Sequence, residues 1–289
     1  MMTTTDNSRP PALRYRLLPL LCLAACSTLP TPAERATTAQ ALTLPGNWQA
    51  STLSSSTFML RSYGPAHIRA DKPLSVYIEG DGFAWLNREQ PSGDPTPIDP
   101  LALRLALAQP DGNAVYLARP CQYLTAQDRR CAQRYWTDAR FSADVIQATD
   151  EAISQLKTRY GARQVSLIGY SGGAAVAALV GARRQDVDRL ISVAGNLDSQ
   201  AWTEHHRISP LRHSLNPADS AERLTQIPQW HLLGQQDRVI PVLIAQSFAR
   251  RAPAQQQLIV SFPGFDHHCC WAAQWPQIWR QLESGTLAP

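Results

Sequence analysis

Short apolar runs alternate with longer segments of helical spacing along most of the chain. Runs rich in β-branched residues, each with the length of a strand that is buried on both faces, occur at 74–80, 113–119, 164–170, 188–195, 229–234 and 257–262. Apolar residues three and four positions apart predict helices at 142–160, 174–184, 242–251 and 271–282. This alternation predicts an α/β fold with a mostly parallel central sheet and helices on both faces. Residues 48–63 predict an antiparallel hairpin ahead of these strands.

Length and composition are those of one large globular domain. The chain has 289 residues, and 44% of them are hydrophobic, which is enough to bury a substantial core. It carries 27 basic and 23 acidic side chains, and the basic ones do not gather into a stripe. This distribution argues against nucleic acid as a partner. The sequence leaves the oligomeric state open.

The first 25 residues have the pattern of an export signal. Arg14 and Arg16 precede an apolar stretch, 17–25, that is too short to span a bilayer. The following "LAAC" resembles the bacterial lipobox, which implies cleavage before Cys26 and lipidation of that cysteine. The alternative is an ordinary signal followed by a chance cysteine. Ser27 resembles an outer-membrane address, so we expect an exported protein, lipid-anchored in the bacterial cell envelope at the periplasmic face of the outer membrane.

Domain boundaries follow from these features. Residues 1–25 are the expected signal peptide, 26–47 a lipidated tether rich in Thr, Ala and Pro, and 48–289 the folded domain.

The four remaining cysteines suit an oxidising compartment. Cys121 and Cys131 enclose a short polar loop and are the expected disulfide. Cys269 and Cys270 are then either bonded to each other or both free. A zinc site is disfavoured because no CxxC spacing occurs, so no metal is expected.

The segment "LIGYSGGAAV" places Ser171 between an expected strand and an expected helix. A Gly-x-Ser-x-Gly pattern at such a turn projects the hydroxyl above the carboxyl end of the sheet. The N–H of Gly172 then points into the same space and is a candidate oxyanion donor. A glycine-rich turn with no catalytic role is the alternative. A phosphate loop is disfavoured because neither GxGxxG nor GK[ST] is present.

Two later strand ends carry the groups that would activate a serine. Asp237 follows the strand at 229–234, and His267 follows the strand at 257–262. Serine needs a base, and the base needs an orienting acid, so we predict a Ser171–His267–Asp237 triad. Asp198 is the alternative acid and His268 the alternative base. Asp266 lies too close in sequence to be the acid and is expected to shape the turn.

Taken together, "GYSGG", "GQQDRVIP" and "DHHCCW" resemble the α/β-hydrolase superfamily. The phrases "EGDGFAW", "SGDPTP", "RPCQY" and "AGNLD" resemble those of bacterial α/β-hydrolase-fold lipoproteins of unassigned substrate. The resemblance covers about residues 74–282 and implies the α/β-hydrolase fold with a small cap insertion at about 196–227. At the strand end that usually carries His-Gly, this chain has Glu79-Gly80-Asp81-Gly82. That loop supplies the second oxyanion N–H in the superfamily, so we assign it to Asp81, with Gly82 as the reserve.

Two long segments flank the expected site. Residues 83–100 form a loop that contains several prolines, and 196–227 occupy the cap position. Trp85, Trp202 and Tyr123 could line a substrate pocket, and aromatic packing under loops is an equal alternative.

The sequence therefore predicts a membrane-anchored serine hydrolase without a cofactor. Its substrate would be a small-molecule or lipid-like ester or thioester, with amides as a further option. One alternative is a non-catalytic envelope protein that uses a hydrolase fold as a binding or scaffold module. Another is metal-dependent hydrolysis through the histidines, which would require stoichiometric zinc.

Overall fold

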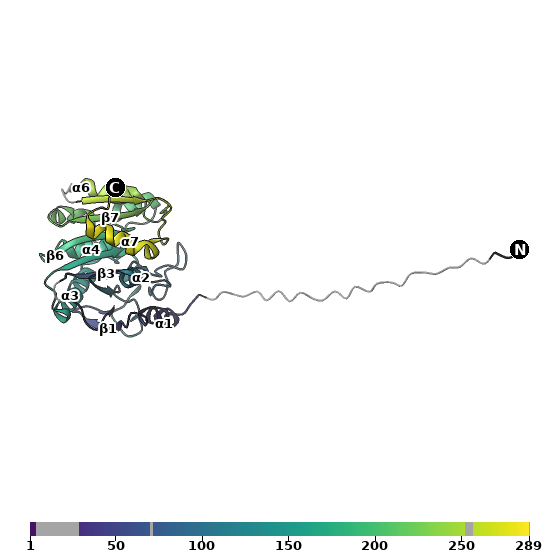
Figure 1. Ribbon diagram of the computed structural model, residues 1–289, viewed down its shortest axis with the longest axis horizontal. Helices are drawn as coiled ribbons and strands as arrows, with labels where there is room; N and C mark the ends of the chain where they lie inside the picture. Colours follow the sequence, from purple (N-terminus) through teal and green to yellow (C-terminus); the bar gives the residue numbers. More distant parts are fainter. Residues whose placement is uncertain (4–28, 70–71, 252–256, 289) are drawn as a thin grey trace.

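A computed structural model describes residues 1–3, 29–69, 72–251 and 257–288 (Figure 1). Cys26 and residues 4–25 of the expected signal lie outside the described residues. Eight strands form one sheet in the order β1-β2-β4-β3-β5-β6-β7-β8. They are β1 (Gln49–Ser54), β2 (Met59–Gly64), β3 (Leu74–Ile78), β4 (Asn113–Leu117), β5 (Val165–Tyr170), β6 (Val187–Val193), β7 (Gln229–Gly234) and β8 (Gln257–Phe262).

The central part of the sheet is parallel. Strand β3 lies between β4 and β5, and its Val76 is in register with Val115 and Leu167. The remaining pairs from β5 to β8 are also parallel. Strand β2 runs antiparallel to both β1 and β4, so the expected hairpin is present. Every residue of β3, β4 and β5 is buried, which explains their continuous apolar sequences.

Helices cover both faces of the sheet. One core cluster joins the strands to α3 (Ala143–Tyr160), α4 (Gly172–Gly181), the 3₁₀-helix η2 (Pro217–Leu224) and Phe248 of α6 (Val242–Arg251). The other joins them to α1 (Pro32–Thr43), α2 (Leu101–Ala108) and α7 (Trp271–Ser284). The mostly parallel sheet with two helical layers confirms the predicted fold class. Within the described ranges, no helix has both the length and the apolarity needed to cross a bilayer.

Three helices were not predicted from the sequence. Helix α2 is apolar around most of its circumference, with five of its eight residues buried, so it lacks a clear helical period. Helix α5 (Ser199–His206) is short and polar. Helix α1 lies in the segment that was expected to be a tether.

The tether prediction is wrong for residues 32–43. Thr31 and Glu34 form a capping box at the start of α1, and Pro32 occupies the first helical position. Arg35 and Ala39 are buried against the domain, at 4% and 0% exposed. The helix is therefore part of the folded body, because a capped helix with one buried side gains more from packing than an extended linker does.

The segment expected to form a cap, 196–227, mostly belongs to the layer that covers the sheet. Ala218, Ala221 and Leu224 of η2 are buried in the core cluster that contains α4. Helix α5, unlike η2, lies beside the loop that follows β7. Trp202 and His206 both contact the carbonyl oxygen of Val239 in that loop at 2.8 Å.

The four cysteines of the folded domain are bonded in two pairs. Cys121 and Cys131 form a disulfide with their Cα atoms 5.5 Å apart. Cys269 and Cys270 are bonded to each other, which decides between the two states that the sequence left open.

Candidate active site

Ser171 occupies a sharp turn between β5 and α4. Its backbone has φ 51° and ψ −120°, a conformation that non-glycine residues rarely adopt. The backbone holds the turn in place, since the Ser171 N–H donates to the Val193 carbonyl at 2.9 Å and the Ser171 carbonyl accepts from Asn196 N–H at 3.0 Å. The strand thus delivers the hydroxyl to the carboxyl edge of the sheet, as the sequence predicted.

The glycines on either side make this turn sterically feasible. A Cβ at Gly169 would come within 2.4 Å of the backbone of Ala174, and one at Gly173 within 2.3 Å of the Ile78 carbonyl oxygen. Both positions therefore allow the helix to start directly against the sheet, which explains the spacing of the motif.

His267 and Asp237 form a hydrogen-bonded chain with this serine. The Nε2 atom of His267 lies 3.1 Å from Oγ of Ser171, and its Nδ1 atom lies 2.9 Å from Oδ2 of Asp237. The other carboxylate oxygen of Asp237 accepts the N–H groups of Val239 and Ile240, each at 2.8 Å. The Asp237 side chain is fully buried and the His267 side chain is 9% exposed. The structure therefore brings together the three side chains predicted from separate strand ends.

Neither of the two alternative residues takes part in this hydrogen-bonded chain. Asp198 caps the N-terminus of α5, and its oxygens are occupied by Ala201 N–H, Asn216 Nδ2 and Ser247 Oγ. His268 directs Nδ1 towards the Tyr170 hydroxyl, at 3.1 Å, and burial together with nearby His267 lowers its pKa.

The loop between His267 and α7 is held by its own hydrogen bonds. Asp266 accepts the N–H groups of His268 and Cys269 at 2.8 and 2.7 Å, as expected for a residue that shapes a turn. The Tyr170 hydroxyl also lies 3.1 Å from the His267 carbonyl oxygen. Tyr170 therefore ties the histidine loop to the serine turn.

The loop that carries the predicted donors Asp81 and Gly82 approaches Ser171, since a Cβ at Gly80 would stand 3.3 Å from the Ser171 Cβ. Gly172 is the first residue of α4, so its N–H is one of those that a helix leaves without an internal partner. Gln122 Nε2 donates to the Gly80 carbonyl at 2.9 Å. Because a trans peptide directs its N–H opposite to its carbonyl, this bond orients the N–H of Asp81 away from Gln122. Gly82, the reserve donor, has φ +66° and lies beside the Pro95 carbonyl.

The Asp81 carboxylate is neutralised by two arginines. Its oxygens lie 3.3 Å from Nη1 of Arg119 and 2.5 Å from Nη1 of Arg140. Burial alone would raise the pKa of Asp81, but the charges of Arg140 and Arg119 lower it below its ordinary value. Burial lowers the pKa of Arg119 to about 10, which leaves it charged at neutral pH. The negative charge of Asp81 is thus balanced by the two guanidinium groups.

The sequence did not identify the residues that hold the Gly80-Asp81 segment, which are Arg119, Gln122 and Arg140. Arg119 and Gln122 lie in the phrase "RPCQY", which was recognised only as a family resemblance. This segment could have indicated the contact, because Arg119 and Gln122 directly follow β4, the strand next to β3. Arg140 carries no comparable signal.

Glu79, at the end of β3, is a second buried carboxylate. Its Oε1 accepts the N–H groups of Gly80 at 2.9 Å and Ala102 at 3.4 Å, and thereby caps α2. Burial raises the pKa of Glu79 to about 7, although these hydrogen bonds oppose the shift. Its role was not predicted, because the contact with α2 depends on the tertiary fold.

A pocket of about 450 Å³ opens beside Ser171 and His267. Phe83, Ile98 and Val239 supply apolar surface, and the other lining residues are Glu79, Asp81, Gly82, Pro97, Asp99, Tyr170 and His268. Trp85, Trp202 and Tyr123, which the sequence suggested as pocket residues, are not part of this lining, and Tyr123 packs against Tyr63 and Tyr116.

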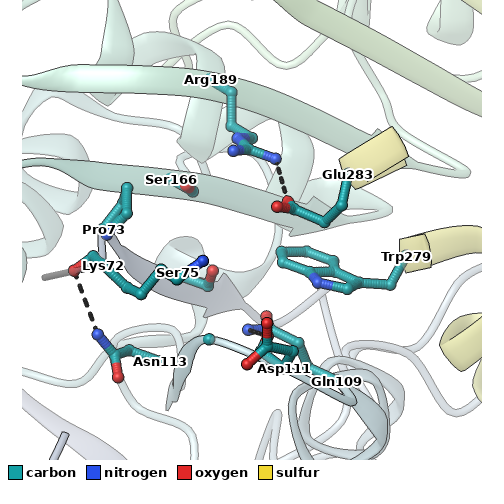
Figure 2. Close-up of a pocket in the computed structure, with 11 residues that line it drawn as sticks. Lys72, Pro73, Ser75, Gln109, Asp111, Asn113, Ser166, Arg189, Trp279 and Glu283 are labelled. Carbon is teal, nitrogen blue, oxygen red and sulfur yellow. Dashed lines mark hydrogen bonds and ion pairs between the residues drawn. The ribbon is translucent and has the colours of Figure 1, made fainter. Parts of the chain in front are cut away.

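A smaller hollow lies at the opposite edge of the sheet, where the strands begin. Figure 2 shows the indole of Trp279 between the Arg189–Glu283 ion pair, at 2.5 Å, and the side chains of Gln109 and Asp111. Its volume of about 30 Å³ would hold one or two water molecules but not an ester. In the part of the chain that the structure describes, no group of three or more His, Cys, Asp or Glu side chains is arranged to hold a metal ion.

Comparisons with solved structures agree on the architecture. The chain is similar to Est1E from Butyrivibrio proteoclasticus, with a TM-score of 0.58 and 14% identity over 83% of this chain and 99% of that one. An alpha-beta serine hydrolase homologue from Coxiella burnetii gives a TM-score of 0.56 and 14% identity over 82% and 96%. A membrane phospholipase A described as a bacterial virulence factor gives 0.53 and 14% over 88% and 90%.

No protein-family model matches the chain, and no curated protein matches it significantly. At these identities the structural neighbours establish the architecture alone. The chain has the α/β-hydrolase fold.

Proposed function

We propose that this chain is a serine hydrolase that cleaves a carboxylic ester or thioester through an acyl-enzyme. The observation that carries the proposal is the hydrogen-bonded chain from Ser171 through His267 to Asp237, beside a pocket of about 450 Å³. A serine hydroxyl is a weak nucleophile, and an imidazole within hydrogen-bonding distance is the group that activates it.

The mechanism follows from the positions of these atoms. His267 Nε2 takes the proton of Ser171 Oγ as that oxygen attacks the substrate carbonyl carbon, and Asp237 stabilises the imidazolium. The N–H groups of Gly172 and Asp81 hold the oxyanion. The tetrahedral intermediate collapses, His267 protonates the departing alcohol or thiol, and water hydrolyses the acyl-enzyme by the same steps.

The named neighbours support an ester as the substrate class. Est1E has a structure with ferulic acid bound, with a TM-score of 0.60 to this chain at 13% identity. Another neighbour is a membrane phospholipase A. The fold does not determine the leaving group, so amides belong in the substrate test.

The activity test uses the purified protein with 4-nitrophenyl butyrate, a matched thioester and a matched anilide. Ser171→Ala should lower kcat by about a thousandfold or more on whichever substrate is cleaved. Ser154→Ala, at an exposed site on α3, serves as the matched control. A folded wild-type protein that cleaves none of the three would favour the binding or scaffold alternative.

We also propose that the mature protein begins at Cys26 and is lipidated there, at the periplasmic face of the outer membrane. The sequence "LAAC" carries this proposal. Mass spectrometry of the mature N-terminus should find acylated Cys26, and Cys26→Ala should accumulate as a precursor. A different, unmodified N-terminus would contradict the assignment.

A further inference from the structure

Helix α1 is bonded directly to the loop that borders the pocket. The guanidinium of Arg35 donates to the carbonyl oxygens of Asp94 and Thr96, and it lies 5.2 Å from the centre of the Phe83 ring. Phe83 lines the pocket, and so does the other end of this loop at Ile98. The first turn of α1 is therefore held at the rim of the candidate active site.

The rest of α1 leads away from that rim. Helix α2 starts beside Glu79, at the carboxyl end of β3, and ends shortly before β4 begins, so it runs from the carboxyl ends of these strands back to their amino ends. Helix α1 packs beside α2 (Figure 1), and the chain after α1 approaches Leu107 near the end of α2. With 12 residues, α1 is about 18 Å long, and its N-terminus is the end at the pocket.

The proposed lipid anchor is therefore close to the pocket. Pro32 lies six positions after Cys26, and a chain of that length spans at most about 20 Å. A lipid on Cys26 would hold the pocket rim within that distance of the bilayer surface. The opposite edge of the sheet would be farther away by roughly the length of α1.

The rim carries exposed apolar side chains on a loop that its own backbone hydrogen bonds hold in place. Hydrogen bonds from Ser92 N–H to the Ala84 carbonyl, at 2.9 Å, and from Leu86 N–H to the Gln90 carbonyl, at 2.8 Å, close residues 84–92 into a hairpin-like loop. All residues from 85 to 90 are exposed, among them Trp85 at 37% and Leu86 at 44%. Ile98, at 40%, lies at the other end of the same rim.

We propose that this rim loop, residues 83–99, docks on the lipid surface that carries the anchor, and that the enzyme takes its ester from lipids in that surface. The proposal rests on the proposed esterase function and on lipidation of Cys26. Tryptophan prefers the interface between headgroups and acyl chains, and Leu86 adds apolar surface beside it. Because residues 26–32 span only a short distance, the lipid on Cys26 would keep the bilayer surface close to these exposed side chains.

The docking test uses the full-length lipidated protein in vesicles of phosphatidylethanolamine and phosphatidylglycerol. Brominated acyl chains should quench part of the tryptophan fluorescence of the wild type. This quenched part should be missing in Trp85→Phe, because it comes from Trp85. Equal quenching of the wild type and Trp85→Phe would overturn docking of the rim loop. This readout does not depend on catalysis.

The substrate test compares Trp85→Ser/Leu86→Ser with Leu44→Ser, since Leu44 is 68% exposed and lies after the far end of α1. Each protein is given a fluorogenic phospholipid in the vesicles and 4-nitrophenyl butyrate in solution. The double variant should lose at least tenfold in phospholipid hydrolysis and keep its soluble activity within twofold, whereas Leu44→Ser should change neither. Equal phospholipid hydrolysis by the two variants would overturn the proposal. A wild type inactive on both substrates would instead refute the esterase function.

Discussion

The carboxylate of Asp81 lies directly against the Cα atom of Gly172. A Cβ at Gly172 would stand 2.1 Å from Oδ1 of Asp81, which is far inside any normal contact. The two residues supply the proposed oxyanion N–H groups, and they come from loops after different strands, β3 and β5. Their close packing therefore sets the distance between the two donors.

Gly172→Ala should lower kcat on a soluble ester by about a hundredfold, because the methyl group must displace Asp81 and so misplace a donor. Gly93→Ala is the matched control, since a Cβ at Gly93 would meet no atom within 4 Å. Steady-state kinetics of the two variants checks this prediction. Equal kcat values in two folded variants would refute the assignment of the oxyanion donors.

Asp81→Asn should lower the free energy of unfolding by about 2–4 kcal/mol, because it leaves two guanidinium groups without a counter-charge. The side chains of Arg119 and Arg140 are only 5% and 6% exposed. Asp111→Asn should cost less than about 1 kcal/mol, since its ion pair with Arg69 is more than half exposed. Urea unfolding at pH 7 measures both values, and similar losses would contradict the role given to the buried cluster.

The main strands could be predicted because each is a continuous buried run between polar segments. The candidate site was predictable for the same reason, since Ser171, Asp237 and His267 each follow such a run. The register of parallel strands then brings these strand ends to one edge of the sheet.

Contacts between distant segments could not be predicted in this way. Arg140 reaches Asp81 across 59 positions, and Arg35 reaches Thr96 across 61. Neither pair has a periodic or local signature, because its geometry exists only after the sheet and its loops have packed. The docking of α1 was missed for the same reason, since a polar helix with few buried residues resembles a linker in composition.

His267→Ala should lower kcat by about a thousandfold or more, because it removes the base that contacts Ser171. His268→Ala should cost far less, since its imidazole contacts Tyr170. Kinetics of both variants, with circular dichroism to verify folding, makes the comparison. A larger loss in the His268 variant would assign the base to the neighbouring residue.

Glu79→Gln should gain stability relative to the wild type as the pH rises from 5 to 8. Burial raises the pKa of Glu79 to about 7, so the folded protein holds a proton that the unfolded chain has mostly released above pH 4.5. Wild-type stability therefore falls as the pH rises through this range, whereas glutamine keeps the hydrogen bonds to Gly80 and Ala102 without titrating. The difference should reach on the order of 2–3 kcal/mol in urea unfolding at pH 5 and pH 8. A difference that does not change with pH would refute the raised pKa.

Covalent labelling by a fluorophosphonate, followed by peptide mapping, tests the central claim most directly. The proposed chemistry predicts one label on Ser171 in the wild type, no label in Ser171→Ala, and much slower labelling in His267→Ala than in His268→Ala. The reagent needs no knowledge of the natural substrate, because it reacts with any serine activated in this way. A folded wild-type protein that carries no label, or a label on another serine, would contradict the assignment of Ser171 as the nucleophile.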